Sequence, residues 1–237
     1  MVAPIVVFDL DGTLVDTAPD LVATLNIVFA RTGLPSVAYA QARNMVGGGA
    51  RKMIEQGLAA AGRHLVAPEV DRLVRDFIDH YAAHIADNSR IFPGLRAALG
   101  QLAQDGCHLA VCTNKLEWLA RKLLDELELT QSFAAICGAD TFGVQKPDPL
   151  FLTSTIGRAG AQADRAVMVG DSISDIAMAK TAGIPVIAVD YGYSETPVAD
   201  LGADRVICDL AHLPTAVSGV MTGAKYGPVA PSALPYP

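Results

Sequence analysis

The chain has 237 residues, of which 51% are hydrophobic and 18% are charged, so it can fill the core of one large domain or of a domain with an insertion. Its formal net charge of −7 argues against nucleic acid or an anionic membrane as a partner, because both bind basic surfaces. An anionic substrate therefore has to be attracted by local cations or by a metal ion.

The four cysteines show neither CxxC pairing nor a neighbouring histidine at the spacing of a zinc site. Cys112, Cys137 and Cys208 lie in apolar, strand-like runs, so we expect buried free thiols, which suit a reducing cytoplasm. The N-terminal apolar run has no basic residue before it and stops at Asp9, which is typical neither of a signal peptide nor of a membrane span. We expect a soluble, cytoplasmic protein.

The first predicted strand covers 5–8, and two acids one residue apart, Asp9 and Asp11, follow it directly. Carboxylates at the end of a buried strand are costly unless a cation or a reaction needs them there. Gly12 lets the backbone turn sharply after the second acid. By itself this stretch fits a solvated Asp-Gly turn equally well, so the rest of the chain has to decide.

Residues 17–86 show apolar positions at helical spacing and no strand pattern. Helical runs lead up to Gly33, cover 37–46 and 50–61, and begin again at Pro68. This block lies between the first and second strands and is too long for a simple crossover, so we predict an inserted all-helical cap domain over 17–86.

Beyond Gly94, helices and strands alternate. The expected strands are 109–112, 134–137, 166–169, 185–189 and 205–208, and the expected helices are 95–104, 116–127, 150–159 and 173–182. Near-continuous apolar strands alternating with helices predict an α/β fold, a Rossmann-like doubly wound parallel sheet covered on both faces. Residues 1–16 and 87–217 would form this core domain, and 218–237, rich in Gly, Pro and Ala, an irregular tail.

Polar side chains follow three of the predicted strands, and ligands bind at the carboxyl ends of the strands in open parallel sheets. Asp9, Asp11 and Asp171 are hard oxygen ligands of the kind that Mg²⁺ prefers. Thr113 and Asn114, at a helix start, are candidates to bind phosphate oxygens. The loop before the helix at 150–159 adds Lys146, which is placed to pair with a phosphate or to restrain a nucleophile.

Each of these residues also has an ordinary structural interpretation. Asp171 is in position to cap the following helix, and Asp175 to complement the dipole of that helix. Thr113 fits an N-cap, and Lys146 fits a solvated surface lysine. Because three strand ends carry related chemistry, however, one convergent site explains them together.

In chain order, four motifs resemble those of the haloacid dehalogenase-like (HAD) phosphohydrolases, and the resemblance covers residues 4–215. The motifs are Asp9-Leu-Asp-Gly-Thr-Leu-Val-Asp, Thr113-Asn114, Lys146-Pro-Asp-Pro and Gly170-Asp-Ser-x-x-Asp175. Among the subfamilies, the chain is most similar to the phosphoglycolate phosphatases. The supporting stretches are Val46-Gly-Gly-Gly, Phe92-Pro-Gly, Thr113-Asn-Lys and Asp190-Tyr-Gly-Tyr.

This resemblance implies roles for the residues of the motifs. Asp9 would attack phosphorus and form an aspartyl-phosphate, while Asp11 would protonate the leaving oxygen and then activate water. Lys146 and Thr113 would offset charge on the transferring group. The implied Mg²⁺ ligands are Asp9, the main-chain carbonyl of Asp11 and Asp171, with Asp175 supporting them.

Substrate choice would fall to the cap, which closes over the site. The glycines at 47–49 could form an anion-binding nest, with Arg51 or Lys52 near it for a substrate carboxylate; a plain loop with solvated basic residues is the alternative. We expect a Mg²⁺-dependent phosphomonoester hydrolase, monomeric or homodimeric, acting on a small phosphorylated metabolite, with 2-phosphoglycolate the first choice. The alternatives are a sugar-phosphate phosphatase, a pyrophosphatase or a β-phosphoglucomutase-like enzyme. A non-catalytic phosphometabolite-binding module would not need the acid at Asp11.

Overall fold

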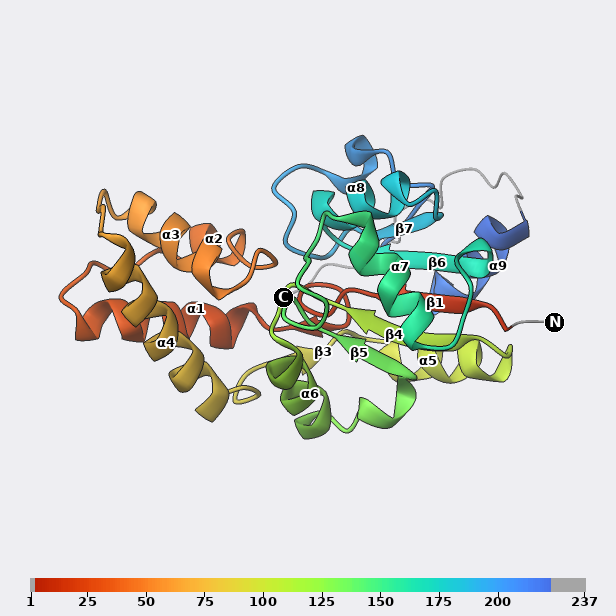
Figure 1. Ribbon diagram of the computed structural model, residues 1–237, viewed down its shortest axis with the longest axis horizontal. Helices are drawn as coiled ribbons and strands as arrows, with labels where there is room; N and C mark the ends of the chain where they lie inside the picture. The colour runs from red at the N-terminus through yellow and green to blue at the C-terminus, as the bar shows by residue number, and fades with distance from the viewer. Residues whose placement is uncertain (1–2, 223–237) are drawn as a thin grey trace.

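Six parallel strands form the central sheet of the computed structural model, which describes residues 3–222 (Figure 1). The strands lie in the order β5-β4-β1-β6-β7-β8, so the first strand is central. Their bounds are β1 Ile5–Phe8, β4 His108–Cys112, β5 Ala135–Cys137, β6 Ala166–Gly170, β7 Val186–Val189 and β8 Arg205–Ile207. This confirms the predicted doubly wound α/β core.

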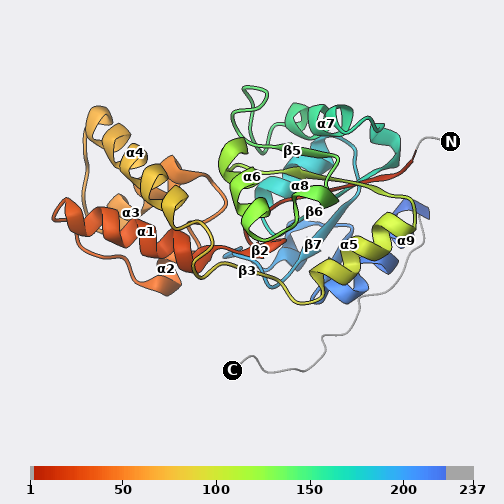
Figure 2. The same ribbon diagram turned by 90° about the horizontal axis from the view of Figure 1, so that it is seen from below.

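Helices cover both faces of the sheet. Successive side chains of a strand point to opposite faces, so an entirely apolar strand needs a covering layer on each face. In β1, Val6 and Phe8 belong to the core on one face, and Ile5 and Val7 to the core on the other. Figure 2 shows α7 on one side of the sheet and α5 and α9 on the opposite side. The first face packs against α5 (Leu95–Gln104), α6 (Glu117–Glu126) and α9 (Leu213–Thr222), and the second against α7 (Pro149–Arg158) and α8 (Ile173–Thr181). Four 3₁₀ turns connect elements of this part: Thr130–Ser132, Ala163–Arg165, Val198–Leu201 and Leu210–His212.

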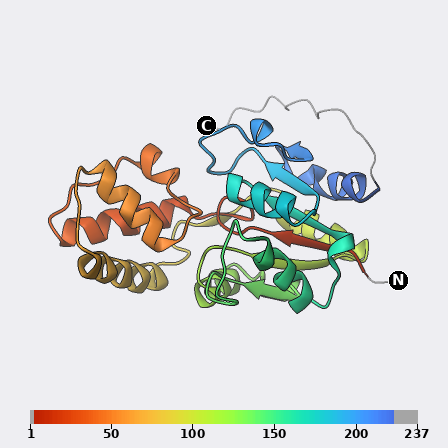
Figure 3. The same cartoon turned by 45° about the horizontal axis from the view of Figure 1, so that its top comes forward.

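The four helices that precede β3 form a separate layer beyond the carboxyl end of the sheet (Figures 1 and 3). They are α1 Ala18–Arg31, α2 Tyr39–Arg43, α3 Ala50–Ala60 and α4 Ala67–Ala83. Phe29 and Phe77 are almost fully buried within the layer. Helix α2 is shorter than the predicted 37–46, because the chain turns after Arg43 and buries Met45.

A two-stranded ribbon joins the helical layer to the sheet, and the sequence pattern did not predict it. Strand β2 (Val15–Asp16) pairs antiparallel with β3 (Arg90–Ile91). Strands of two residues are too short to show the alternation by which strands are recognised. Both ends of the helical layer therefore pass through one paired connection.

Asp20, in the first turn of α1, holds the segment that leads into β3 by hydrogen bonds. Its carboxylate accepts hydrogen bonds from the main-chain N–H groups of Asn88 at 3.0 Å and Ser89 at 2.7 Å, and from the Ser89 hydroxyl at 2.7 Å. The burial of Asp20 alone would raise its pKa. The hydrogen bonds from Ser89 and Asn88 outweigh that effect and hold the pKa of Asp20 below its ordinary value.

We expect Asp20→Asn to lower the free energy of unfolding at pH 7 by about 1–3 kcal/mol, because buried donors lose a charged acceptor. Because the pKa of Asp20 is lower in the folded state than in the unfolded state, its ionised carboxylate stabilises the fold at pH values above the unfolded-state pKa of about 3.8. This stabilisation is lost as the pH falls through the folded-state pKa. Urea unfolding should therefore show a smaller difference between the variant and the wild type at pH 3 than at pH 7. Asp79→Asn, at an exposed position of α4, is the matched control. An equal loss at both pH values would contradict this role.

Two further expectations need correction. Residues 218–222 are the last turns of α9 rather than an irregular tail, because Val217, Val220 and Met221 pack against the sheet core; the rest of the predicted tail lies outside the described residues. All four cysteines are free thiols, but Cys208, one residue beyond β8, is only partly buried. Within residues 3–222, no helix has the length and apolar character needed to cross a bilayer.

Candidate active site

Asp9 and Asp11 lie in the turn that directly follows β1. Both are nearly buried, and the main-chain N–H of Leu10 donates to Asp9 Oδ1 at 2.7 Å. The turn needs Gly12, whose φ is +84° and where a Cβ would lie 2.5 Å from Asp171 Oδ2. The absence of a side chain at this position lets the acid from β6 approach the acids from β1.

Asp171 directly follows β6, the parallel neighbour of β1, and Asp175 lies in the first turn of α8. Asp171 accepts hydrogen bonds from the Tyr193 N–H at 2.7 Å and from the Thr13 hydroxyl at 2.9 Å. Asp175 also takes part in a capping box, since its Oδ2 accepts from the Ser172 N–H at 3.2 Å. The N-cap of α8 is Ser172 rather than Asp171, so the helix-cap interpretation of Asp171 is wrong. Asp175 lies in the first turn of that helix, where one of its oxygens joins the capping box and the other pairs with Lys146.

Lys146 joins the two groups of acids. Its Nζ lies 2.7 Å from Asp9 Oδ1 and 2.6 Å from Asp175 Oδ1, and its side chain is almost fully buried. The Asn114 Oδ1 atom accepts from the Lys146 main-chain N–H at 3.0 Å and positions the loop. The interpretation of Lys146 as a solvated surface lysine is therefore wrong.

The electrostatics of this cluster favour a bound cation. Burial raises the pKa of Asp9 well above its usual value, and burial together with the charge of Asp175 raises the pKa of Asp171 to about 6. Burial would lower the pKa of Lys146, but Asp175 and Asp9 outweigh it and raise that pKa. Three carboxylates thus share a single ammonium group, which leaves an excess of buried negative charge.

One oxygen atom from each of Asp9, Asp171 and Asp175 lies within 4.8 Å of the others. Hard oxygen donors at this spacing suit Mg²⁺ or a similar divalent ion. The donor set and the excess negative charge therefore fit the metal that the motifs imply. Asp175, expected only to support the ligands, belongs to the same group of oxygen atoms as the other two acids.

Thr113 and Asn114 follow β4, on the other side of β1. Thr113 is 1% exposed, and its hydroxyl accepts from the Lys115 N–H at 3.2 Å. The Asn114 amide donates to the Gly47 carbonyl of the helical layer at 3.2 Å, so its side chain bridges the two parts of the molecule. Both residues lie at the predicted edge of the sheet, and the side chain of Asn114 is engaged in holding loops.

The sequence analysis missed Lys115 as a site residue. Its ammonium lies 3.0 Å from Asp11 Oδ2 and 3.1 Å from the hydroxyl of Tyr81, which belongs to α4. The Thr17 hydroxyl donates to the other oxygen of Asp11 at 2.7 Å. The only signal in the sequence is the stretch Thr113-Asn-Lys, one of those that resemble the phosphoglycolate phosphatases.

Arg51 lines a cavity together with the glycines at 47–49, and it also makes ion pairs of its own. Its guanidinium is half-exposed and pairs with Asp71 and, at 3.6 Å, with Glu55, both within the helical layer. Arg43 donates to the Gly192 carbonyl at 2.8 Å and lies 4.8 Å from the ring centroid of Tyr193, so it contacts the loop after β7. Neither arginine makes an ion pair with the acids that follow β1 and β6.

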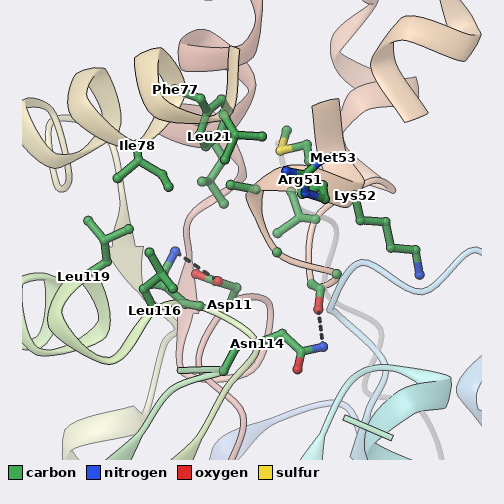
Figure 4. Close-up of a pocket in the computed structure, with 18 of the residues that line it drawn as sticks. Asp11, Leu21, Arg51, Lys52, Met53, Phe77, Ile78, Asn114, Leu116 and Leu119 are labelled. Atoms are coloured by element: carbon green, nitrogen blue, oxygen red, sulfur yellow. Dashed lines mark hydrogen bonds and ion pairs between the residues drawn. The ribbon is translucent and has the colours of Figure 1, made fainter. Parts of the chain in front are cut away.

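Two adjoining cavities of about 460 Å³ each lie between the helical layer and the sheet, and Gly47 and Gly48 line both of them. The first contains Asp11 and Lys115, and Figure 4 shows its apolar walls. The second is more polar and contains Asp171 and Lys146. The walls of the first include Leu21, Met53, Val74, Phe77, Ile78, Leu116 and Leu119.

Comparisons with known proteins agree with this geometry. A family model described as haloacid dehalogenase-like hydrolase matches residues 6–189. A phosphoglycolate phosphatase of Mesorhizobium japonicum is 50% identical over 207 residues, covering 87% of this chain and 91% of the relative. One of Caulobacter vibrioides is 46% identical over 217 residues, 92% of each chain. The crystal structure of a predicted phosphoglycolate phosphatase from Haemophilus somnus matches with a TM-score of 0.84 at 27% identity, covering 90% of this chain and 97% of that one.

Proposed function

The chain belongs to the haloacid dehalogenase-like hydrolases, and from this premise we propose that it hydrolyses 2-phosphoglycolate through an aspartyl-phosphate at Asp9. The observation that carries the mechanism is the position of Asp9. It lies 2.7 Å from the Lys146 ammonium and beside Asp171 and Asp175, two residues before a second acid. The helices α1–α4 are proposed to act as the cap.

In the first step, an oxygen of Asp9 forms a bond to phosphorus while the bond from phosphorus to the leaving oxygen breaks. The Leu10 N–H and the Lys146 ammonium both contact Oδ1 of Asp9. Neither of them contacts Oδ2 of Asp9, which is the oxygen left to attack phosphorus. Asp11 gives its proton to the leaving oxygen, then takes a proton from the water that attacks the phosphoenzyme. Thr17 and Lys115 hold Asp11 in place for both transfers.

A bound Mg²⁺ would be held by Asp9, Asp171, Asp175 and the main-chain carbonyl of Asp11, and it would neutralise charge on the transferring phosphoryl group. Lys146 adds a fixed positive charge next to the nucleophile. Because the three acids are already in place, little reorganisation is needed when charge develops.

The choice of 2-phosphoglycolate rests on the names of the relatives and is tested by a substrate panel in the presence of Mg²⁺. The panel contains 2-phosphoglycolate, glucose 6-phosphate, β-glucose 1-phosphate and pyrophosphate. We expect kcat/KM to be highest for 2-phosphoglycolate, by about tenfold or more. A sugar phosphate or pyrophosphate that exceeds it by the same margin would instead support one of the alternative activities of this family.

Removal of divalent ions with EDTA is expected to abolish turnover, and Mg²⁺ to restore it. Asp171→Asn should raise the Mg²⁺ concentration needed for half-maximal activity by about tenfold or more, because a charged ligand is lost. Thermal unfolding with and without Mg²⁺ gives a second readout, since an ion that binds the folded state raises the Tm. Full activity in EDTA would rule out the proposed role of the metal.

A further inference from the structure

We infer that Lys115 binds the carboxylate of the substrate and so selects 2-phosphoglycolate over phosphate esters that lack an acid group. This inference rests on the proposed function and deepens it. The crevice consists of a polar and an apolar cavity. Asp171 and Lys146 line the polar cavity, whereas Asp11 lines the apolar one. A phosphoryl group held at the polar side therefore presents its leaving oxygen to Asp11 and the rest of its leaving group to the apolar cavity.

Lys115 is the buried cation of that apolar cavity. Its side chain is 5% exposed, and Asp11 and Tyr81 contact its ammonium group at 3.0 and 3.1 Å. An ammonium group has three donors, so two contacts leave one donor for a ligand. The Tyr81 ring lies 4.5 Å from Nζ and further fixes its position.

The other cations near the cavity are less suited to this role. Arg51 is already paired with Asp71 and Glu55 and is half-exposed. Lys52 is exposed, and Figure 4 shows its side chain extending away from Asp11. Lys115 is the cation that directly contacts the acid at which the leaving group is protonated.

The apolar walls strengthen the interaction that we assign to Lys115. Charges attract more strongly where the surroundings exclude water, and Phe77, Ile78, Leu116 and Leu119 provide such surroundings. A neutral alcohol gains no comparable attraction from the ammonium. The cavity therefore discriminates by charge.

The spacing also fits a short acid. Lys115 Nζ lies 3.0 Å from Asp11 Oδ2, so a ligand that touches both groups needs its ester oxygen close to its carboxylate. In 2-phosphoglycolate a single methylene group separates the ester oxygen from the carboxyl carbon. The preferred substrates are thus 2-phosphoryloxy acids, and acids with a longer spacer should be poorer substrates.

The test compares 2-phosphoglycolate with 2-hydroxyethyl phosphate, in which a hydroxymethyl group replaces the carboxylate. Lys115→Met should lower the ratio of the two kcat/KM values by roughly 100-fold, because only one substrate loses an ion pair. Lys122→Met makes the same change at an exposed lysine of α6 and should change that ratio by less than about threefold. Equal losses on both substrates in Lys115→Met would mean that Lys115 only positions Asp11, and would overturn the inference.

Calorimetric titration gives a readout that is independent of turnover. In an Asp9→Asn background, the further change Lys115→Met should weaken binding of 2-phosphoglycolate by about 30-fold or more relative to 2-hydroxyethyl phosphate. If circular dichroism shows that Lys115→Met does not fold, Lys115→Arg takes its place, and its wider head group should raise KM selectively for 2-phosphoglycolate. Equal effects on both ligands again overturn the inference. A wild type that prefers a substrate without a carboxylate refutes the proposed function itself, whatever Lys115 variants do.

Discussion

Asp9→Asn is expected to lower kcat by about 10⁴-fold or more, because loss of the group that forms the covalent bond removes most of the catalysis. The amide has the size of the carboxylate but is a poor nucleophile. The side chain also loses its charge next to the ammonium of Lys146, at 2.7 Å in the wild type. Steady-state assays with saturating 2-phosphoglycolate and Mg²⁺ measure the effect.

The control for this variant is Asp200→Asn, which makes the same chemical change at an exposed residue that lines neither of the two cavities. It should retain the kcat of the wild type within about twofold. Circular dichroism and the Tm establish that Asp9→Asn is folded. A folded Asp9→Asn protein with more than a few per cent of wild-type turnover would rule out Asp9 as the nucleophile.

Lys146→Met is expected to affect stability and activity together. It leaves Asp9 and Asp175, both buried, without their counter-ion, and breaking a buried pair in this way costs about 3–5 kcal/mol of unfolding free energy. We expect kcat to fall by about 10³-fold, because a fixed charge beside the reacting group is lost. Urea unfolding in EDTA and steady-state assays in Mg²⁺ measure the two effects.

The control is Lys122→Met, which removes the ammonium group of an exposed lysine of α6. We expect it to change the free energy of unfolding by less than about 0.5 kcal/mol. Mg²⁺ should reduce the stability deficit of Lys146→Met, because the ion supplies positive charge to the same carboxylates. If Lys146→Met unfolds at the same urea concentration as Lys122→Met, the ion pairs to Asp9 and Asp175 contribute little.

Much of the sheet could be predicted because its strands are short, continuous apolar runs. Helix α5 begins and ends where the pattern placed it, at Leu95 and Gln104, and the strands around β1 differ from expectation by one residue at most at each end. The ribbon of β2 and β3 could not be predicted in this way. Two paired residues carry no periodicity, and their pairing brings together Val15 and Ile91, far apart in the chain.

Site residues could be predicted where an acidic side chain directly follows a buried strand, as Asp9 and Asp171 do. Lys115 could not be predicted in this way. It follows Thr113 and Asn114 as an ordinary basic residue before a helix, and its contact with Asp11 arises because β4 pairs with β1. Its second contact depends on α4 lying over the sheet edge, which no local pattern encodes.

Arg51 shows that a basic residue can have ion-pair partners that its local sequence does not reveal. A basic residue at the start of α3, next to a glycine loop, has the sequence features of an anion-binding residue. The side chain instead pairs with acids on α3 and α4, an arrangement that helical spacing favours for Glu55 and that tertiary packing supplies for Asp71. A charged residue next to a loop therefore predicts a ligand-binding role less reliably than a charged residue at the end of a buried strand.

The most direct test of the account is to trap the covalent intermediate. The enzyme is mixed with 2-phosphoglycolate labelled at phosphorus, quenched in acid within milliseconds, and digested for peptide mapping. We predict label on the peptide that contains Asp9, with the added mass of one phosphoryl group, and none in Asp9→Asn. Label on another residue, or full turnover without any labelled peptide, would contradict the proposed mechanism.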